Sequence, residues 1–214
     1  KGLMEWRMVT SWPKGLPGLG AGGERLAANI TTMSGGRLAI KVFAAGELVP
    51  ALECFGAVAN GTAQMGHDAS YYHTGKSEGC AFFTAFPFGF TTAEMEAWVK
   101  YGNGQKLWDE LYAPFGIRAF HAGSTGTQMF GWFRKEIRSL ADLEGLKFRA
   151  PGNQGRVLQK LGVTPVTLPG GEIFPALQSG AIDGAEWIGP YNDLALGFYQ
   201  ACRYYYSPGY HEPG

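Results

Sequence analysis

The chain has 214 residues, of which 45% are hydrophobic, and its 18 basic and 18 acidic side chains give a formal net charge of zero. This balance does not favour binding to nucleic acid or to an anionic membrane surface, and no run approaches the roughly 20 apolar residues of a membrane span. The 33 glycines, about twice the usual share, predict many tight turns between short elements. The three cysteines form no CxxC motif; they are Cys54, Cys80 and Cys202. Two of them could form one disulfide, but unpaired buried thiols are the commoner condition for such residues.

Strands alternate with helices in the first half of the chain. The expected elements are strands over residues 6–11, 38–43, 63–67 and 117–121, and helices over residues 19–33, 50–58 and 91–107. Thr91 or Thr92 can cap the last of these helices, and Glu94 is placed for a capping box. The glycine-flanked run 123–126 separates two strand-like runs, and we place a crossing between two lobes there.

The second half repeats this alternation, which is typical of βαβ units and mostly parallel sheets. Strands are expected at 128–133, around Arg149, at 163–168, around Glu186 and at 204–206, with helices over 139–143, 153–161, 172–179 and 192–198. The sequence therefore predicts an α/β protein with a mixed, mostly parallel sheet in each of two lobes, residues 1–123 and 124–206. Residues 207–214 lead from a strand into a turn without a closing element, as expected of an interrupted chain at the start of a return crossing.

A glycine motif precedes the first predicted helix. Gly18, Gly20 and Gly23 fit the dinucleotide-binding pattern G-x-G-x-x-G. That pattern needs its glycines directly at the strand end, so that a pyrophosphate meets the helix N-terminus. Here Trp12, Pro13, Lys14 and Pro17 lie between the strand and the glycines, and the second strand ends at Phe43 rather than at an acidic residue. We favour a plain loop that opens the helix and keep a nucleotide-dependent oxidoreductase as the alternative function.

Charged side chains end two of the predicted strands. Arg149 ends an apolar strand before Pro151-Gly152, and Glu186 stands among apolar residues. Because ligands of open α/β sheets bind at the carboxyl ends of the strands, a guanidinium there suits a carboxylate and a glutamate suits a cation. Together they predict a small organic acid held with a metal ion. A surface or interdomain ion pair for Arg149 and a solvated loop for Glu186 stay open as structural alternatives.

Four uncharged residues extend this predicted site. Gln128 opens the first strand after the crossing, and its amide oxygen suits a hard cation, although it could equally satisfy a buried backbone group. Trp187 is typical of a core residue, but it could floor a pocket while its backbone carbonyl meets the cation. Tyr71 and Tyr72, in the loop after the third strand, would present a phenol from the opposite lobe.

Six runs of the sequence match a known family. They are TSWP at 10–13, AGEL at 45–48, STGTQM at 124–129, DLEGLKFR at 142–149, ALQSGAIDGAEW at 176–187 and YYYSPG at 204–209. Through them the chain resembles the solute-binding proteins of tripartite ATP-independent periplasmic (TRAP) transporters. The resemblance is strongest to the branch that binds 2-oxo and 2-hydroxy monocarboxylates, which Glu186-Trp187 marks.

The resemblance implies a two-lobed periplasmic receptor that closes over its ligand by a hinge and is not an enzyme. It implies that Arg149 clamps the carboxylate of a pyruvate- or lactate-like solute. Gln128, Glu186 and the backbone of Trp187 would hold Na⁺ or Ca²⁺, which also contacts the ligand, and a loop tyrosine would add a hydrogen bond. The receptor would deliver its solute to the membrane subunits of a TRAP transporter.

The resemblance also concerns the end of the chain. Family members are longer, so a C-terminal part is expected to be missing here. In some members of the branch that part exchanges a helix between subunits, and a homodimer through it is therefore one expectation. His211 matches a position near the cleft where the family often has tryptophan or histidine, and it is a further substrate-binding candidate.

Overall fold

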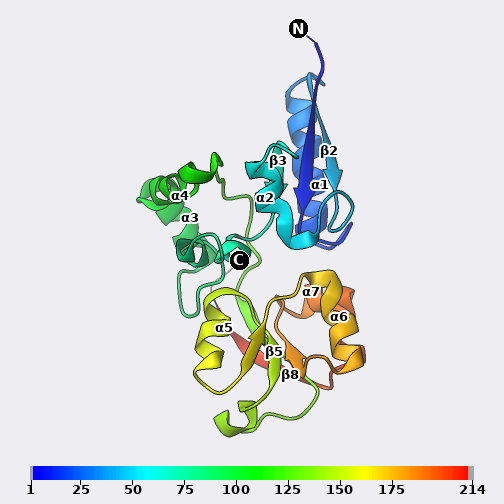
Figure 1. Ribbon diagram of the computed structural model, residues 1–214, viewed down its shortest axis with the longest axis vertical. Coiled ribbons are helices and arrows are strands. Elements are labelled where there is room, and N and C mark those ends of the chain that lie inside the picture. Colours follow the sequence, from blue (N-terminus) through cyan, green and yellow to red (C-terminus); the bar gives the residue numbers. More distant parts are fainter. Residues whose placement is uncertain (1, 212–214) are drawn as a thin grey trace. The chain divides into compact units, whose positions relative to one another are not determined.

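The computed structural model describes residues 2–211 (Figure 1). The chain forms two compact units, one from residues up to 68 together with 115–117, and the other from 69–114 together with 118 onward. The lobe boundaries that the sequence predicts, at 123 and 206, stay a prediction. No helix within the described residues has both the length and the hydrophobicity to cross a membrane.

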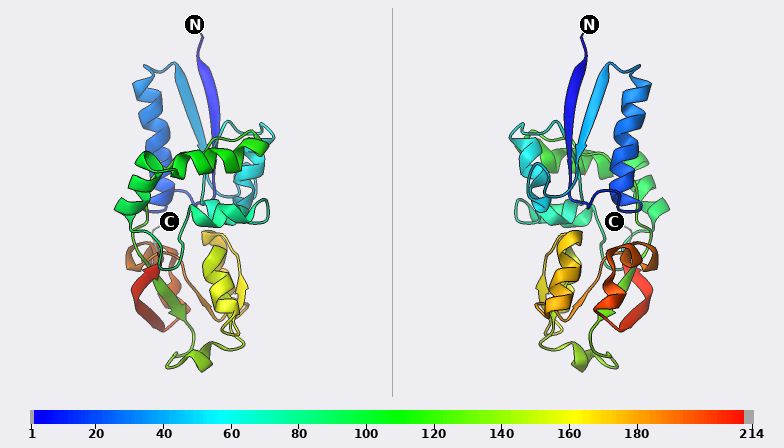
Figure 2. Two further views of the ribbon diagram at one scale, coloured as in Figure 1. Left: turned by 90° about the vertical axis from the view of Figure 1, so that its left-hand side faces the viewer. Right: turned by 90° about the vertical axis from the view of Figure 1, so that its right-hand side faces the viewer.

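The first unit is built on a small parallel sheet in the order β2-β1-β3. Helix α1 packs along β2 and β1 (Figure 2), and Val9, Cys54, Ala57 and Ala63 form a buried cluster. The bounds of α1 and β2 confirm the predicted ones. The elements are β1 (Met4–Thr10), α1 (Leu19–Met33), β2 (Leu38–Phe43), a 3-10 turn η1 (Ala51–Glu53), α2 (Cys54–Ala59) and β3 (Met65–His67).

The glycine motif is used for packing in this unit. Gly18 is the N-cap of α1 with φ 74°, while Gly20 and Gly23 lie inside the helix and are buried. A Cβ on Gly20 would collide with the carbonyl oxygen of Pro13, and one on Gly23 would lie 3.4 Å from Nδ1 of His67. These glycines let the helix approach its own unit closely, which gives the nucleotide alternative no support.

Two glycines of α1 make a matched pair for a stability experiment. A Cβ on Gly22 would meet nothing within 4 Å, so Gly22→Ala is expected to stabilise the protein by about 0.5–1 kcal/mol through the lower entropy of the unfolded chain. Gly20→Ala is expected to destabilise it by about 1–3 kcal/mol, because the added Cβ would clash with the carbonyl oxygen of Pro13, and a backbone atom cannot move aside as a flexible side chain can. Urea unfolding of both variants checks this, and shifts of the same sign would contradict it.

The second unit contains a mixed sheet of five strands in the order β6-β5-β7-β4-β8. Strand β5 runs parallel to both β6 and β7, and β4 is antiparallel to β7 and β8. Figure 1 shows α5 on one side of β5 and α6 with α7 on the other. The elements are β4 (Gln128–Phe133), η5 (Leu140–Leu143), β5 (Lys147–Arg149), α5 (Gly152–Gln159), β6 (Thr164–Val166), α6 (Gly170–Ser179), β7 (Gly184–Ala185), α7 (Pro190–Leu196), η6 (Phe198–Gln200) and β8 (Tyr204–His211).

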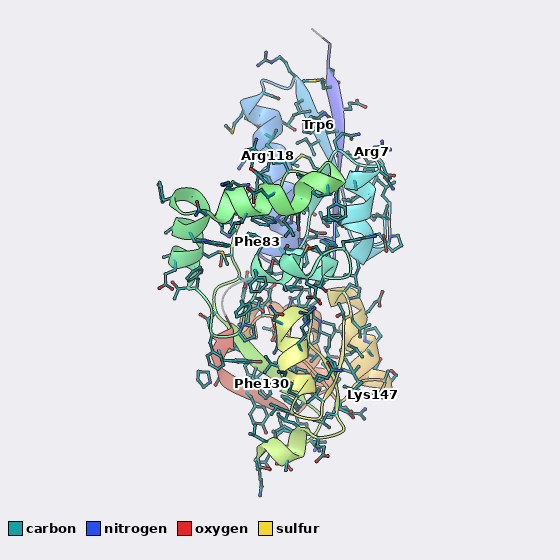
Figure 3. All side chains as sticks on the ribbon, turned by 60° about the vertical axis from the view of Figure 1, so that its left-hand side comes forward. Trp6, Arg7, Phe83, Arg118, Phe130 and Lys147 are labelled. Carbon is teal, nitrogen blue, oxygen red and sulfur yellow. The ribbon has the colours of Figure 1, made fainter. Side chains whose placement is uncertain are left out.

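Aromatic rings form much of the core of this sheet. Phe130, labelled in Figure 3, packs against Phe133 and Phe148, whose rings stack on each other with centroids 4.8 Å apart. Tyr206 closes the cluster with its edge toward Phe133. Phe148 therefore anchors β5 in the core directly before Arg149. The mixed α/β architecture predicted from the sequence is confirmed.

The helical part of the second unit corrects one predicted helix. The capping box of Thr91 and Glu94 is present, but the predicted helix over 91–107 is two helices, separated at Gly102. A Cβ on Gly102 would lie 2.8 Å from the carbonyl oxygen of Trp98, so the break brings the chain close to that residue. Trp98 stacks on Phe83, which is labelled in Figure 3. The elements are η2 (Ser70–His73), η3 (Glu78–Phe82), α3 (Thr92–Tyr101), α4 (Gly104–Tyr112) and η4 (Ala113–Phe115).

The strand expected over residues 117–121 is wrong, since the structure describes no strand there. The carbonyl oxygen of Ala119 accepts a hydrogen bond from the side chain of Gln105 instead of a neighbouring strand. Phe120 is exposed and lies under the guanidinium of Arg118. An alternating apolar pattern does not make a strand without a partner strand. The cysteines, by contrast, agree with the interpretation as unpaired thiols, because all three are buried and free.

Candidate binding site

Arg149 ends β5 at its carboxyl end, and its side chain is fully buried at 0% exposure. Its guanidinium donates hydrogen bonds from all three of its nitrogens. Nε donates to the carbonyl oxygen of Leu168 at 3.1 Å, and Nη2 donates to the hydroxyl of Tyr72 at 3.2 Å. Nη1 donates both to the backbone oxygen of Glu186 at 2.8 Å and to its Oε2 at 3.0 Å. The arginine is thus at the predicted strand end, but it is enclosed in an ion pair rather than facing an open crevice.

Glu186 is the partner in that ion pair and directly follows β7. Its side chain is 2% exposed, and Oε1 is buried without a hydrogen-bond partner among the described residues. Burial raises the pKa of Glu186 to about 8 against the opposing charge of Arg149. An unsatisfied buried acceptor costs about 1–3 kcal/mol. The carboxylate therefore has an oxygen free to take a ligand, and a nearby positive charge would relieve its burial.

Trp187 lies beneath the guanidinium. The Cζ atom of Arg149 is 4.9 Å from the centroid of the Trp187 ring, a distance that gives a cation–π contact. A Cβ on Gly170, at the start of α6, would lie 2.8 Å from Cη2 of the indole. The buried ring accordingly acts as a floor under Arg149, which combines the two interpretations that the sequence left open for it.

The two tyrosines belong to the same compact unit as Arg149. The Tyr72 hydroxyl accepts a hydrogen bond from the guanidinium, and the Tyr71 ring packs edge-on against Tyr72 at 4.7 Å. Burial raises the pKa of Tyr71 well above its usual value, so its hydroxyl stays protonated. A Cβ on Gly152 would lie 3.0 Å from Cβ of Tyr71. This close approach at φ 59° lets the start of α5 pack on the tyrosine loop.

Gln128 opens β4, as the sequence predicts, and is buried. Its amide nitrogen donates to Oγ1 of Thr125 at 3.0 Å, so the amide oxygen is the atom that a cation would take. The backbone N–H of Met129 donates to the carbonyl oxygen of Ile188 at 2.9 Å. A Cβ on Gly131 would lie 2.5 Å from the carbonyl oxygen of Ala185. These two contacts place the start of β4 alongside the segment that carries Glu186 and Trp187.

His211 can be placed only by its backbone. It ends β8, where it is the register partner of Gln128. Its side chain lies outside the described part of the chain, so the expectation for it stays a prediction.

Asp193 and Gln154 are two buried polar residues that the sequence did not single out. Asp193, in the first turn of α7, accepts hydrogen bonds from three donors, and burial raises its pKa to about 6. An acid shortly after Gly189-Pro190 is typical of a helix start, and that signal could have found it. Gln154 donates to the hydroxyl of Tyr210 at 2.7 Å, and its Oε1 is buried without a partner among the described residues. No pattern in the sequence marks it.

The donor set determines which kind of metal site is possible. Among the described residues, no cluster of three or more His, Cys, Asp or Glu side chains could hold a metal ion. A cation here would therefore combine the Glu186 carboxylate with neutral oxygens, the ligands that hard cations such as Ca²⁺ accept. The unpartnered Oε1 of Glu186 fits such an ion.

Comparisons with known proteins place the chain in a family. The family model of the bacterial extracellular solute-binding proteins, family 7 (DctP), matches residues 8–213. A monocarboxylate 2-oxoacid-binding periplasmic protein of Nostoc is 51% identical over 211 residues, which are 99% of this chain and 58% of the relative.

Two solved structures of TRAP transporter solute-binding proteins are similar in fold as well as in sequence. The protein of Bordetella bronchiseptica, with copurified calcium and picolinate, has a TM-score of 0.96 at 42% identity over 100% of this chain and 64% of that chain. The protein of Pseudoalteromonas atlantica, with bound sodium and pyruvate, has a TM-score of 0.95 at 44% identity over 99% and 64%. The chain thus spans less than two thirds of the length of these relatives. It belongs to family 7 of the bacterial extracellular solute-binding proteins.

Proposed function

We propose that this chain is part of a periplasmic receptor that binds a small 2-oxo or 2-hydroxy monocarboxylate, such as pyruvate or lactate, together with Na⁺ or Ca²⁺. The receptor would deliver its solute to the membrane subunits of a TRAP transporter. The buried pair of Arg149 and Glu186 at neighbouring strand ends carries the proposal, because Oε1 of the glutamate has no partner among the described residues. The Nostoc relative and the sodium- and pyruvate-bound structure support the same solute class.

Each residue of the site has a role in this proposal. Arg149 binds the solute carboxylate, and its three bonded nitrogens and the indole below it fix the plane of the guanidinium. Gln128, Glu186 and the backbone oxygen of Trp187 hold the cation, which supplies positive charge to the carboxylate and to the oxygen on the adjacent carbon. Tyr72 is the loop tyrosine that would add a hydrogen bond, because its hydroxyl already accepts one from Arg149.

The remaining expectations belong to the same proposal. Tyr71, whose hydroxyl stays neutral, and His211 are further solute contacts. The lobes at 1–123 and 124–206 would close on the solute by a hinge. A homodimer would form through a part of the receptor that this chain does not include. The oxidoreductase alternative is not proposed, because its glycines pack against Pro13 and His67.

The charges require the cation. A solute carboxylate beside Glu186 would place two negative charges against the single positive charge of Arg149 in a buried space, which is unfavourable unless a further positive charge joins them. Pyruvate titrated calorimetrically into the full-length protein is therefore expected to bind at least about tenfold more tightly with Ca²⁺ or Na⁺ than with chelator in a potassium buffer. Equal affinity in all three buffers would remove the cation from the proposal.

A further inference from the structure

Asp193 is a second buried carboxylate, and it hydrogen-bonds to the backbone that directly follows Glu186 and Trp187. Its side chain is 1% exposed. Oδ1 accepts from the backbone N–H groups of Ile188 at 3.1 Å and Gly189 at 3.2 Å. Oδ2 accepts from Nε1 of Trp132 at 2.9 Å. The two backbone donors follow Glu186 and Trp187 within three residues, so the carboxylate fixes the turn that presents the proposed cation ligands.

These donors require an anion at this position. An indole N–H and backbone N–H groups can only donate, and the ionised carboxylate is the side chain of this size that accepts at both of its oxygens. An asparagine could accept from the two backbone N–H groups with its amide oxygen, but it would turn its NH₂ group toward the Trp132 donor. The negative charge is therefore part of the hydrogen-bond network and not an incidental feature of a helix start.

The buried charges do not balance. Among the described residues, the buried Arg, Lys, Asp and Glu side chains are Arg149, Glu186 and Asp193. When all three are ionised, they carry one positive and two negative charges. A monocarboxylate solute adds a third negative charge. A monovalent cation would leave a net charge of minus one in the filled site, and a divalent cation would leave none.

We infer that Asp193 makes the cation site of this receptor select a divalent ion such as Ca²⁺ over Na⁺. The inference rests on the proposed function and adds to it the charge of the ion. The negative charge of the ligands is a main determinant of Ca²⁺ affinity at a site, and a further buried charge behind those ligands acts in the same direction, because water screens a buried charge less than an exposed one.

The test compares two cations in the full-length protein. At a fixed, saturating pyruvate concentration, the half-saturating concentrations of Ca²⁺ and Na⁺ are measured calorimetrically at equal ionic strength. Tryptophan fluorescence titrations with each cation alone give a readout without solute. The parent is expected to favour Ca²⁺ by at least about tenfold, and Asp193→Asn is expected to reduce that ratio by about tenfold or more.

Trp132→Phe is the matched control, because it removes one hydrogen bond to Asp193 and leaves the charge. It is expected to shift the affinities for both cations together and to keep their ratio. The double variant Asp193→Asn with Trp132→Phe removes the indole N–H that would otherwise face the NH₂ group of the asparagine. It replaces the single asparagine variant in the cation titrations if that variant does not fold.

Three outcomes separate the ideas. A parent that prefers Na⁺, or an asparagine variant that weakens both cations equally, would overturn the inference and leave the proposed function intact. A parent that binds pyruvate equally with and without either cation would refute the cation in the proposed function itself. A ratio that falls only in the variants without the Asp193 charge supports the inference.

Discussion

Lysine in place of Arg149 is expected to weaken pyruvate binding by about 10- to 150-fold, equivalent to the 1.5–3 kcal/mol of a hydrogen bond to a charged group. The guanidinium reaches Leu168, Glu186 and Tyr72 from three nitrogens at once. A lysine ammonium is a single point of charge and cannot span those partners and a solute carboxylate in one plane. Calorimetric titration of the full-length variant with pyruvate and Ca²⁺ measures the loss.

Arg156→Lys is the matched control for this experiment. Arg156 lies in α5 of the same unit, where its half-exposed guanidinium pairs with Glu78 at 3.0 Å, and exposed pairs of this kind contribute about 0–1 kcal/mol. Pyruvate affinity is expected to be unchanged in this variant. If Arg149→Lys bound pyruvate as tightly as the parent while keeping its melting temperature, Arg149 would have a structural role only.

Glu186→Gln is expected to abolish the dependence of pyruvate binding on Ca²⁺. The glutamine keeps an oxygen and nearly the same volume but removes the charge, so the solute carboxylate no longer meets a like charge. The ratio of the pyruvate dissociation constants without and with Ca²⁺ should fall to about one. Without solute, and above about pH 8 where Glu186 is ionised, the variant is expected to be destabilised by about 3–5 kcal/mol, because Arg149 loses its buried counter-ion.

Calorimetry with and without Ca²⁺ and urea unfolding check both parts of this prediction. Glu172→Gln is the control, since Glu172 is exposed in the first turn of α6 and should leave the Ca²⁺ dependence unchanged. A glutamine variant that still needed Ca²⁺ would exclude Glu186 as the ligand that makes binding depend on the cation.

The sequence predicted well which charged residues stand at the ends of the short buried strands β5 and β7. Arg149 and Glu186 each follow apolar residues and precede a Pro- or Gly-marked turn. Their meeting depends on register, which places Arg149 opposite Ala185 in the parallel pair of β5 and β7. The bounds of α1 were predictable for a similar local reason, because Gly18 precedes it and Gly35-Gly36 follows it.

The features that the sequence did not predict depend on residues distant in the chain. Asp193 accepts one of its hydrogen bonds from Trp132, 61 positions earlier. Residues 117–121 have a strand-like pattern, but a side chain occupies the acceptor at Ala119. Patterns along the chain indicate local conformational preference and burial. They do not indicate which residues from elsewhere in the chain will contact a given segment in the fold.

The missing side chain at Gly131 limits how receptors of this kind can change their solute. Because β4 runs against the backbone of β7 at that point, any larger residue would push the two strands apart and carry Gln128 away from the turn after Glu186. A pocket for a bulkier acid therefore cannot be opened or lined from this strand without displacing the proposed cation ligands. Selection of the solute by size must therefore come from residues outside this strand pair, such as the loop of Tyr71 and Tyr72. The charged groups then keep their positions while the residues that line the rest of the pocket change.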